Sequence, residues 1–276
     1  MLGYAQINLI NRNLQNITWV NMQNLGGKIL KPANIIFYAL TIIINSLAGG
    51  TTLIGGKLTA AVSDANPTLI TPAGYVFSIW SIIYILLGAF VIYQALPSRS
   101  KRGFTERIGW LFVLSSIINI TWIFFWQFEY LTVSVVLIFL LLASLIAIYV
   151  RLGIGKTQAG LDDQLAVHLP FSVYLGWITV ASIANVATAL VSLNWDGAGI
   201  SPETWAILVV AVALVITALM LITRRDIAYS LVIIWALVGI AVKQSGNQTI
   251  VMLTEISAVI VAIMLIATII IAKARK

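Results

Sequence analysis

The sequence contains no cysteine and a single histidine, His168. The absence of cysteine excludes disulfides, thiolate nucleophiles and cysteine metal sites. One histidine cannot form a histidine-rich metal centre, so we predict no metal site. His168 is interpreted as a hydrogen-bonded residue at the membrane interface, although it is the only imidazole that could ligate the metal of a bound tetrapyrrole.

Charged residues are also scarce, at 9% of the chain, whereas soluble domains carry about 25%. The sequence shows no paired carboxylates and no nucleophile–base set, so we predict no catalytic residues and no enzymatic activity. The formal net charge of +7 does not indicate nucleic-acid binding, because basic residues in membrane proteins mainly set orientation.

Hydrophobic residues make up 61% of the chain, and the mean hydropathy is +1.02. They occur in runs of about 20, the length that crosses roughly 30 Å of hydrocarbon. The short alternating segments of a membrane β-barrel are missing. We therefore predict an all-α polytopic membrane bundle in contact with the lipid bilayer. Its expected spans are about 34–56, 70–96, 105–127, 131–151, 164–193, 203–223, 227–243 and 249–272.

The basic residues are distributed unevenly around these spans. Eight spans place both termini on one side, and only Lys57 and Lys243 fall on the other side. Such asymmetry predicts that both termini are cytoplasmic. The basic residues on the predicted cytoplasmic side are Arg12, Lys28, Lys31, Arg99, Lys101, Arg102, Arg107, Arg151, Lys156, Arg224, Arg225, Lys273, Arg275 and Lys276.

Three regions are expected. Residues 1–33 form an Asn-rich tail, either a short interfacial helix with Ile7, Ile10, Leu14 and Ile17 on one face or a disordered or partner-bound segment. Residues 34–195 hold the first five spans. The joint from Asn194 to Pro202 leads into residues 196–276, which hold the last three.

Aromatic residues recur on one face of three expected helices. Phe77, Trp80, Tyr84 and Gly88 follow helical spacing, and three stacked aromatics above a glycine could support a flat ligand or another helix. Later faces carry Asn119, Trp122 and Trp126, then Tyr174, Trp177 and Ala181. We predict that these faces converge and line one pocket; helix packing and interfacial anchoring are the alternatives for each single aromatic.

These motifs resemble the TspO/MBR family, also called translocator or tryptophan-rich sensory proteins, over about residues 34–195. The family has a proline before its second helix, an Asn-x-x-Trp in its third, and a Pro-aromatic run ending in Ala and Asn in its fifth. Its first-loop tryptophan has no counterpart in residues 57–71. The matching residues are Pro72, Phe77, Trp80, Tyr84, Gly88, Asn119, Trp122, Phe125, Trp126, Leu169, Pro170, Phe171, Tyr174, Leu175, Trp177, Ala181 and Asn185.

The resemblance implies a five-helix bundle that binds porphyrins or other tetrapyrroles, sterols or drug-like aromatics, as a sensor or transporter. No cofactor is required; a tetrapyrrole would be a ligand. The implied ligand-binding residues are Phe77, Trp80, Tyr84, Asn119, Trp122, Trp126, Tyr174, Trp177 and Asn185.

Two other functions remain open. The three extra spans and the tail could dock a homodimer partner or a larger membrane complex, which would make the chain a structural or assembly subunit. Alternatively, Glu255, inside the last span, could serve a proton- or ion-coupled small transporter, because buried membrane charges are often functional. A local ion pair between Lys243 and Glu255 is the structural interpretation of the same residues.

Overall fold

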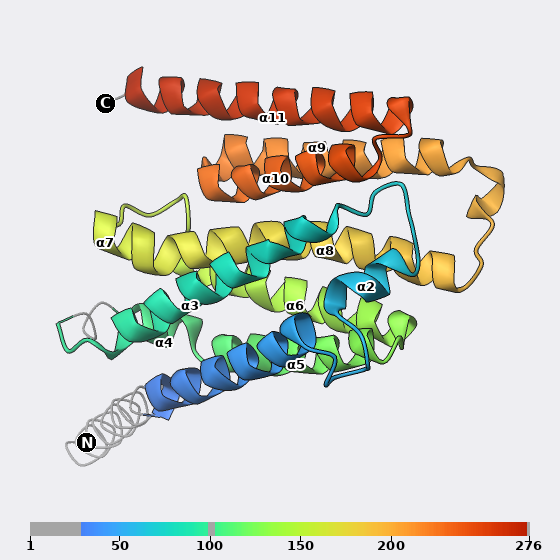
Figure 1. The fold of residues 1–276 in the computed structure, drawn as a ribbon. Helices are drawn as coiled ribbons and strands as arrows, with labels where there is room; N and C mark the ends of the chain where they lie inside the picture. The colour runs from blue at the N-terminus through green and yellow to red at the C-terminus, as the bar shows by residue number, and fades with distance from the viewer. Residues whose placement is uncertain (1–28, 99–102, 275–276) are drawn as a thin grey trace, which may run out of the picture.

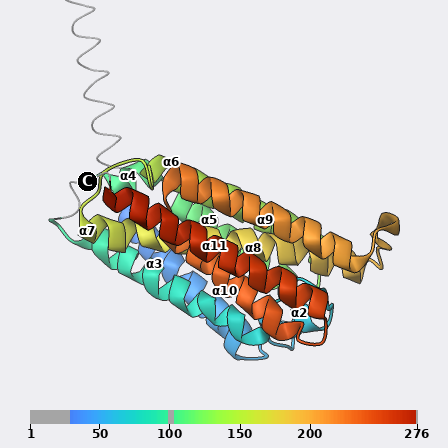
Figure 2. The ribbon, with the colours of Figure 1, turned by 90° about the horizontal axis from the view of Figure 1, so that it is seen from above.

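A computed structural model describes residues 29–98 and 103–274, and within these ranges the chain contains helices and no strand. The long helices are Ile29–Gly50, α3 (Ile79–Ala95), α5 (Leu111–Gln127), α6 (Leu131–Leu152), α8 (Leu169–Ser192), α9 (Pro202–Arg224), α10 (Ile227–Lys243) and α11 (Gln248–Ala274). The long helices lie side by side with their axes roughly aligned, α3 being inclined to its neighbours (Figures 1 and 2). Short helical segments are α2 (Thr59–Asp64), η1 (Gly74–Ser78), α4 (Phe104–Ile108), α7 (Leu161–Asp163), η3 (Gln164–His168) and η4 (Gly197–Gly199).

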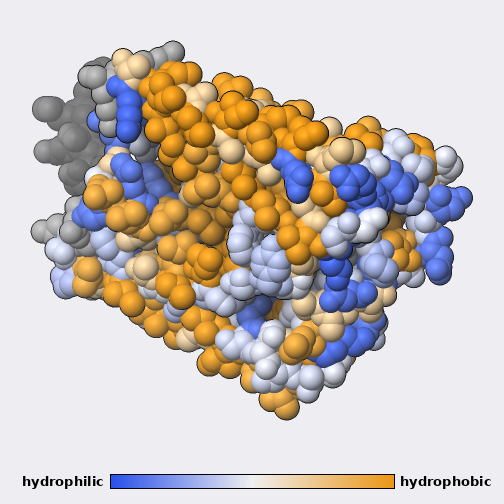
Figure 3. All heavy atoms as spheres, turned by 45° about the horizontal axis from the view of Figure 1, so that its top comes forward, coloured by the Kyte–Doolittle hydropathy of each residue, from blue (hydrophilic) through white to orange (hydrophobic). Residues whose placement is uncertain are grey.

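The helices have the length and composition of membrane spans. Six of those described are long and apolar enough to cross a bilayer. The other two, α5 and α10, have 17 residues each, which corresponds to about 25 Å of helix. Figure 3 shows apolar side chains over the middle of one face and hydrophilic ones towards its ends. The prediction of an all-α polytopic membrane bundle is therefore confirmed.

Two expected spans differ from the observed helices. Within the described residues the first helix covers Ile29–Gly50, so it ends about six residues before the expected end at residue 56. The expected span 105–127 is divided at Gly109, whose φ of 58° lies in the left-handed region that glycine adopts without steric penalty. The expectation of an interfacial or disordered N-terminal tail concerns residues that are mostly outside the described ranges.

Helix α8 is the central helix and contacts α3, α6 and α10. Ten consecutive residues from Pro170 to Thr179 are buried, as expected for a helix that is covered on all sides. Pro170 lacks a backbone N–H, and the turn before it, Gln164–His168, widens into a π-helix. A π turn commonly accommodates such a local loss of helical hydrogen bonding.

Asp226 connects α6 and α8, which belong to the first five spans, to α10, which belongs to the last three. Its carboxylate caps α10 by accepting a hydrogen bond from the Tyr229 backbone N–H at 3.0 Å. The hydroxyls of Tyr149 and Ser172 each donate to Asp226 Oδ2 at 2.7 Å. One buried carboxylate thereby links α6, α8 and α10, and these charge-assisted bonds compensate for its loss of hydration.

The two ends of the bundle differ in charge. The Ile29 side of the first helix and the C-terminal side of α11 lie at the same end of the bundle (left in Figure 1). Helix alternation brings nearly all described basic residues to this end, namely Lys31, Arg107, Arg151, Lys156, Arg224, Arg225 and Lys273. That this end is cytoplasmic stays a prediction.

At the opposite end, the expected Lys243–Glu255 pair is wrong. Lys243 Nζ instead lies 2.7 Å from Asp64 Oδ1, a residue 179 positions away in the sequence. Glu255 is exposed on α11, between the exposed apolar residues Met252 and Ile256. The carboxylate therefore faces outward from the bundle.

Candidate functional site

The tryptophans of three helices meet around Trp80 of α3. Its ring centroid lies 5.6 Å from that of Tyr84, 5.9 Å from Trp122, 6.0 Å from Tyr174 and 6.1 Å from Trp177. Tyr84 is stacked on Trp80, Tyr174 and Trp177 are edge-on to it and Trp122 is tilted by 32°; the separations are those of favourable aromatic pairs. Helices that are far apart in the sequence thus present their aromatic faces to one another.

A small cavity lies within this aromatic cluster, with a volume of about 20 Å³. Six of the nine predicted ligand-binding residues line it, whereas Tyr84, Asn119 and Tyr174 do not. The complete lining is Ser63, Pro72, Phe77, Trp80, Trp122, Trp126, Trp177, Val180, Ala181, Ala184 and Asn185.

The size of this cavity departs from the expected pocket. Sites for drug-sized ligands have volumes of about 300–1,000 Å³, and 20 Å³ is sufficient for about one water molecule. The rings fill the space between the helices themselves. In the conformation described, the cluster is closed, and a flat ligand would have to separate α3 from α5 and α8.

Most polar groups of the cluster are bonded within the protein. Asn119, fully buried, accepts from Asn45 Nδ2 at 2.8 Å and donates from Nδ2 to Tyr174 Oη at 3.0 Å. This chain of bonds connects the first helix, α5 and α8. Asn119 therefore bonds across helices in this conformation, and its prediction as a ligand-binding residue stays a prediction.

Asn185 forms the second polar link. It accepts from Trp122 Nε1 at 2.9 Å, and its own Nδ2 donates to Ser134 Oγ at 2.8 Å. The side chain is 1% exposed. Because both ends of the amide are engaged, Asn185 fixes the orientation of Trp122 at the wall of the cavity.

Two buried donors of the cluster, the Tyr84 hydroxyl and Trp177 Nε1, have no hydrogen-bond partner among the described residues, and of the two only Trp177 lines the cavity. The Trp177 side chain is buried. Buried donors are almost always paired, and an unpaired one costs about 1–3 kcal/mol. The cavity wall therefore retains a donor, Trp177 Nε1, that an acceptor in the cavity could satisfy.

The glycine of the expected aromatic shelf supports another helix. A Cβ at Gly88 would lie 2.2 Å from Tyr38 Oη. Tyr38, in the first helix, donates this hydroxyl to the Tyr84 carbonyl at 2.9 Å. The aromatic face above Gly88 was expected to support either a flat ligand or another helix. At Gly88 itself the structure shows another helix.

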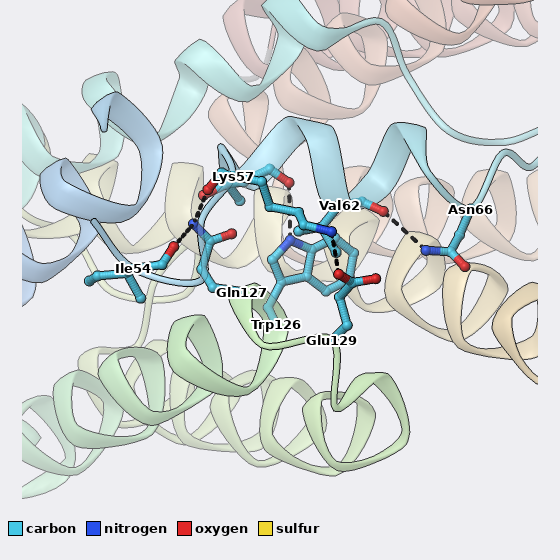
Figure 4. A network of polar contacts seen from close by, with 8 residues as sticks. Ile54, Lys57, Val62, Asn66, Trp126, Gln127 and Glu129 are labelled. Carbon is cyan, nitrogen blue, oxygen red and sulfur yellow. Dashed lines mark hydrogen bonds and ion pairs between the residues drawn. The ribbon is translucent and has the colours of Figure 1, made fainter. Parts of the chain in front are cut away.

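A cap segment, residues 51–78 with α2 and η1, covers the end of the cluster opposite the chain termini and supplies Ser63, Pro72 and Phe77 to the cavity. Figure 4 shows its attachment to the α5–α6 turn. Gln127 Nε2 donates to the carbonyls of Ala48 and Lys57 at 2.8 and 3.0 Å. Lys57 also forms an ion pair with Glu129.

Sequence reasoning named Ala181 on the third aromatic face but missed Ala184, Val180 and the cap residue Ser63 as parts of the cavity wall. Ala184 lies seven residues after Trp177 and therefore shares its helical face, a signal that was available. Ser63 carried no such signal, because its contribution depends on how the cap folds back. Glu255 does not line the cavity, and the structure provides no contact between them.

One comparison with known proteins gave a match. The family described as TSPO-like protein matches residues 29–271, which include α9, α10 and all but the last three residues of α11. No curated protein and no solved structure matches the chain.

Proposed function

This chain belongs to the TSPO-like protein family, and on that premise we propose that it binds a flat apolar ligand at the tryptophan cluster. It would act as a membrane sensor or transporter for a tetrapyrrole, a sterol-like molecule or another aromatic compound. The observation that carries the proposal is Trp177 Nε1, a buried donor that has no acceptor within the described part of the chain while its ring lines the cavity.

The ligand class follows from the lining. Apart from Ser63 and Asn185, the side chains are apolar, and four are tryptophans, so a flat apolar molecule would gain both burial and ring stacking. The Trp177 N–H would bond an acceptor at its edge. Charged hydrophilic ligands would lose hydration without gaining a counter-charge.

Binding requires the cluster to open, and α3 is the wall that is suited to move. Trp80 of α3 and Phe77 of the adjoining η1 are partly exposed, whereas Trp122, Trp126 and Trp177 are buried. On the α8 side, Ala181 and Ala184 leave room once the rings separate. Displacement of α3 would change helix packing, which is how occupancy would be signalled or the ligand released.

A fluorescence titration tests this proposal. Protoporphyrin IX is added to the full chain in lipid nanodiscs, and the quenching of tryptophan emission is followed. Trp80→Phe should weaken binding about tenfold, from the loss of roughly 1.4 kcal/mol of stacking and burial. The matched control Trp205→Phe, outside the cavity, should stay within about twofold of the wild type. Absence of saturable quenching, or equal effects of the two variants, would overturn the proposal.

A second candidate is a structural or assembly role, favoured by the closed interior and by the outward Glu255 on α11. A carboxylate among exposed apolar side chains is unfavourable in lipid and would be stabilised by a donor from another membrane helix. Purification in mild detergent distinguishes the candidates. Stoichiometric co-purification of another subunit, lost in Glu255→Gln, favours assembly, and a monodisperse single chain argues against it.

A further inference from the structure

Helix α10 contacts the cap segment along two separate lines. The first joins the start of η1 to the middle of α10: the Ala73 N–H donates to the Gly239 carbonyl at 3.0 Å, and Trp235 Nε1 donates to the Val76 carbonyl at 3.2 Å. A Cβ on Gly239 would lie 2.1 Å from Val76 Cγ2. The two backbones are thus in close contact, and this line is rigid.

The second line joins α2 and the following loop to the end of α10. Lys243 Nζ lies 2.7 Å from Asp64 Oδ1, and Gln244 Nε2 donates to the Thr68 carbonyl at 2.9 Å. The Lys243 and Asp64 side chains are 36% and 46% exposed. Exposed ion pairs are weak and sensitive to salt, so this line can break while the first one remains.

Both lines lie directly beside cavity residues. Ser63 precedes Asp64, Pro72 precedes Ala73, and both Ser63 and Pro72 line the tryptophan cavity. On its other side the cap is held by Trp126 Nε1, which donates to the Thr59 carbonyl at 3.1 Å (Figure 4). Release of the Lys243–Asp64 line would therefore free the part of the cap that carries Ser63 to move away from the cavity.

We propose that α10 is a clamp on the cap, so that the C-terminal helices regulate access of the apolar ligand to the tryptophan cluster. The inference rests on the proposed function for the identity of what enters, but the clamp itself can be measured without any ligand. The Ala73–Gly239 contact stays formed and acts as the hinge about which the cap moves. The Lys243–Asp64 ion pair holds the cap closed. A displacement of α10, relayed through α9 or α11, would then open or close the site.

Because the sequence contains no cysteine, a single introduced thiol can test the role of the Lys243–Asp64 pair. Ser63→Cys places the only thiol of the chain at a position that is 2% exposed, and its reaction rate with a water-soluble maleimide reports opening. In the full chain in nanodiscs, adding Lys243→Gln should accelerate labelling about two- to fivefold. Raising the salt concentration should accelerate labelling in the Ser63→Cys parent and have little effect once Lys243 is replaced.

Two controls separate the clamp from general loosening. Lys273→Gln removes the same charge at the opposite end of the bundle and should leave the labelling rate unchanged. The exchanged pair Asp64→Lys/Lys243→Asp should return labelling to within about twofold of the parent, since the attraction is restored. Equal labelling with and without Lys243, or no recovery in the exchanged pair, would overturn the clamp.

A second experiment, with added ligand, tests whether the clamp regulates access of the ligand to the tryptophan cluster. Protoporphyrin IX should associate about two- to fivefold faster with Lys243→Gln than with the wild type, in step with the labelling rate. Faster labelling with an unchanged association rate would overturn the role of the clamp in access. Failure of the underlying function has a different signature, because porphyrin would then not bind saturably to any variant while the labelling differences persist.

Discussion

Replacing Gly88 by alanine should expose how tightly the first helix is seated on α3. The added methyl would lie 2.2 Å from Tyr38 Oη and 3.1 Å from Tyr38 Cζ, so the tyrosine has to move away. Overpacking of this kind costs about 1–3 kcal/mol. We expect Gly88→Ala to lower the free energy of unfolding by about 2 kcal/mol, even though alanine favours helices more than glycine does.

A substitution of Tyr38, the residue that contacts Gly88, measures the coupling between the two positions. Tyr38→Phe removes the bond to the Tyr84 carbonyl and should cost about 1 kcal/mol alone. In the Gly88→Ala background it also removes the clashing oxygen, which leaves Cζ as the nearest atom. The double variant should therefore lose about 1.5 kcal/mol rather than the additive 3, a coupling of roughly 1.5 kcal/mol.

Reversible unfolding in mixed micelles measures all four members of this cycle. Gly49→Ala is the control, because nothing lies within 4 Å of its added methyl and it should be neutral or slightly stabilising. If Gly88→Ala is as stable as the wild type, or if the two substitutions simply add, the close seating of Tyr38 on Gly88 is refuted.

Two further outcomes concern the buried polar links. Asp226→Ala should lower the free energy of unfolding by about 2–3 kcal/mol, because it removes an N-cap and leaves the Tyr149 and Ser172 hydroxyls without their acceptor. Asp196→Ala, which removes the exposed cap of η4, is the control in the same unfolding assay. Asn119→Leu should cost about 1–2 kcal/mol through the loss of two interhelical bonds. A merely ligand-binding Asn119 would instead leave the unliganded protein as stable as the wild type.

The class of the protein could be read from local properties of the sequence. A run of about 20 apolar residues can satisfy its backbone in lipid only as a helix, so composition and run length were sufficient to predict an all-α polytopic bundle. The aromatic faces were also predictable, since Trp80 and Tyr84 share a face through helical spacing alone. Gly109 shows the limit of such reasoning. Hydropathy predicted one continuous helix over residues 105–127, whereas the positive φ of Gly109 separates α4 from α5.

The tertiary structure decided what the helical faces do when they meet. Whether three aromatic faces leave a hollow or fill it depends on interhelical distances, and packing here leaves about 20 Å³. Likewise, Lys243 is close to Glu255 in sequence but pairs with Asp64, since the cap folds back over the bundle end. Periodicity fixes the direction of a side chain on its own helix; the separation between helices is set by the fit of all their side chains together.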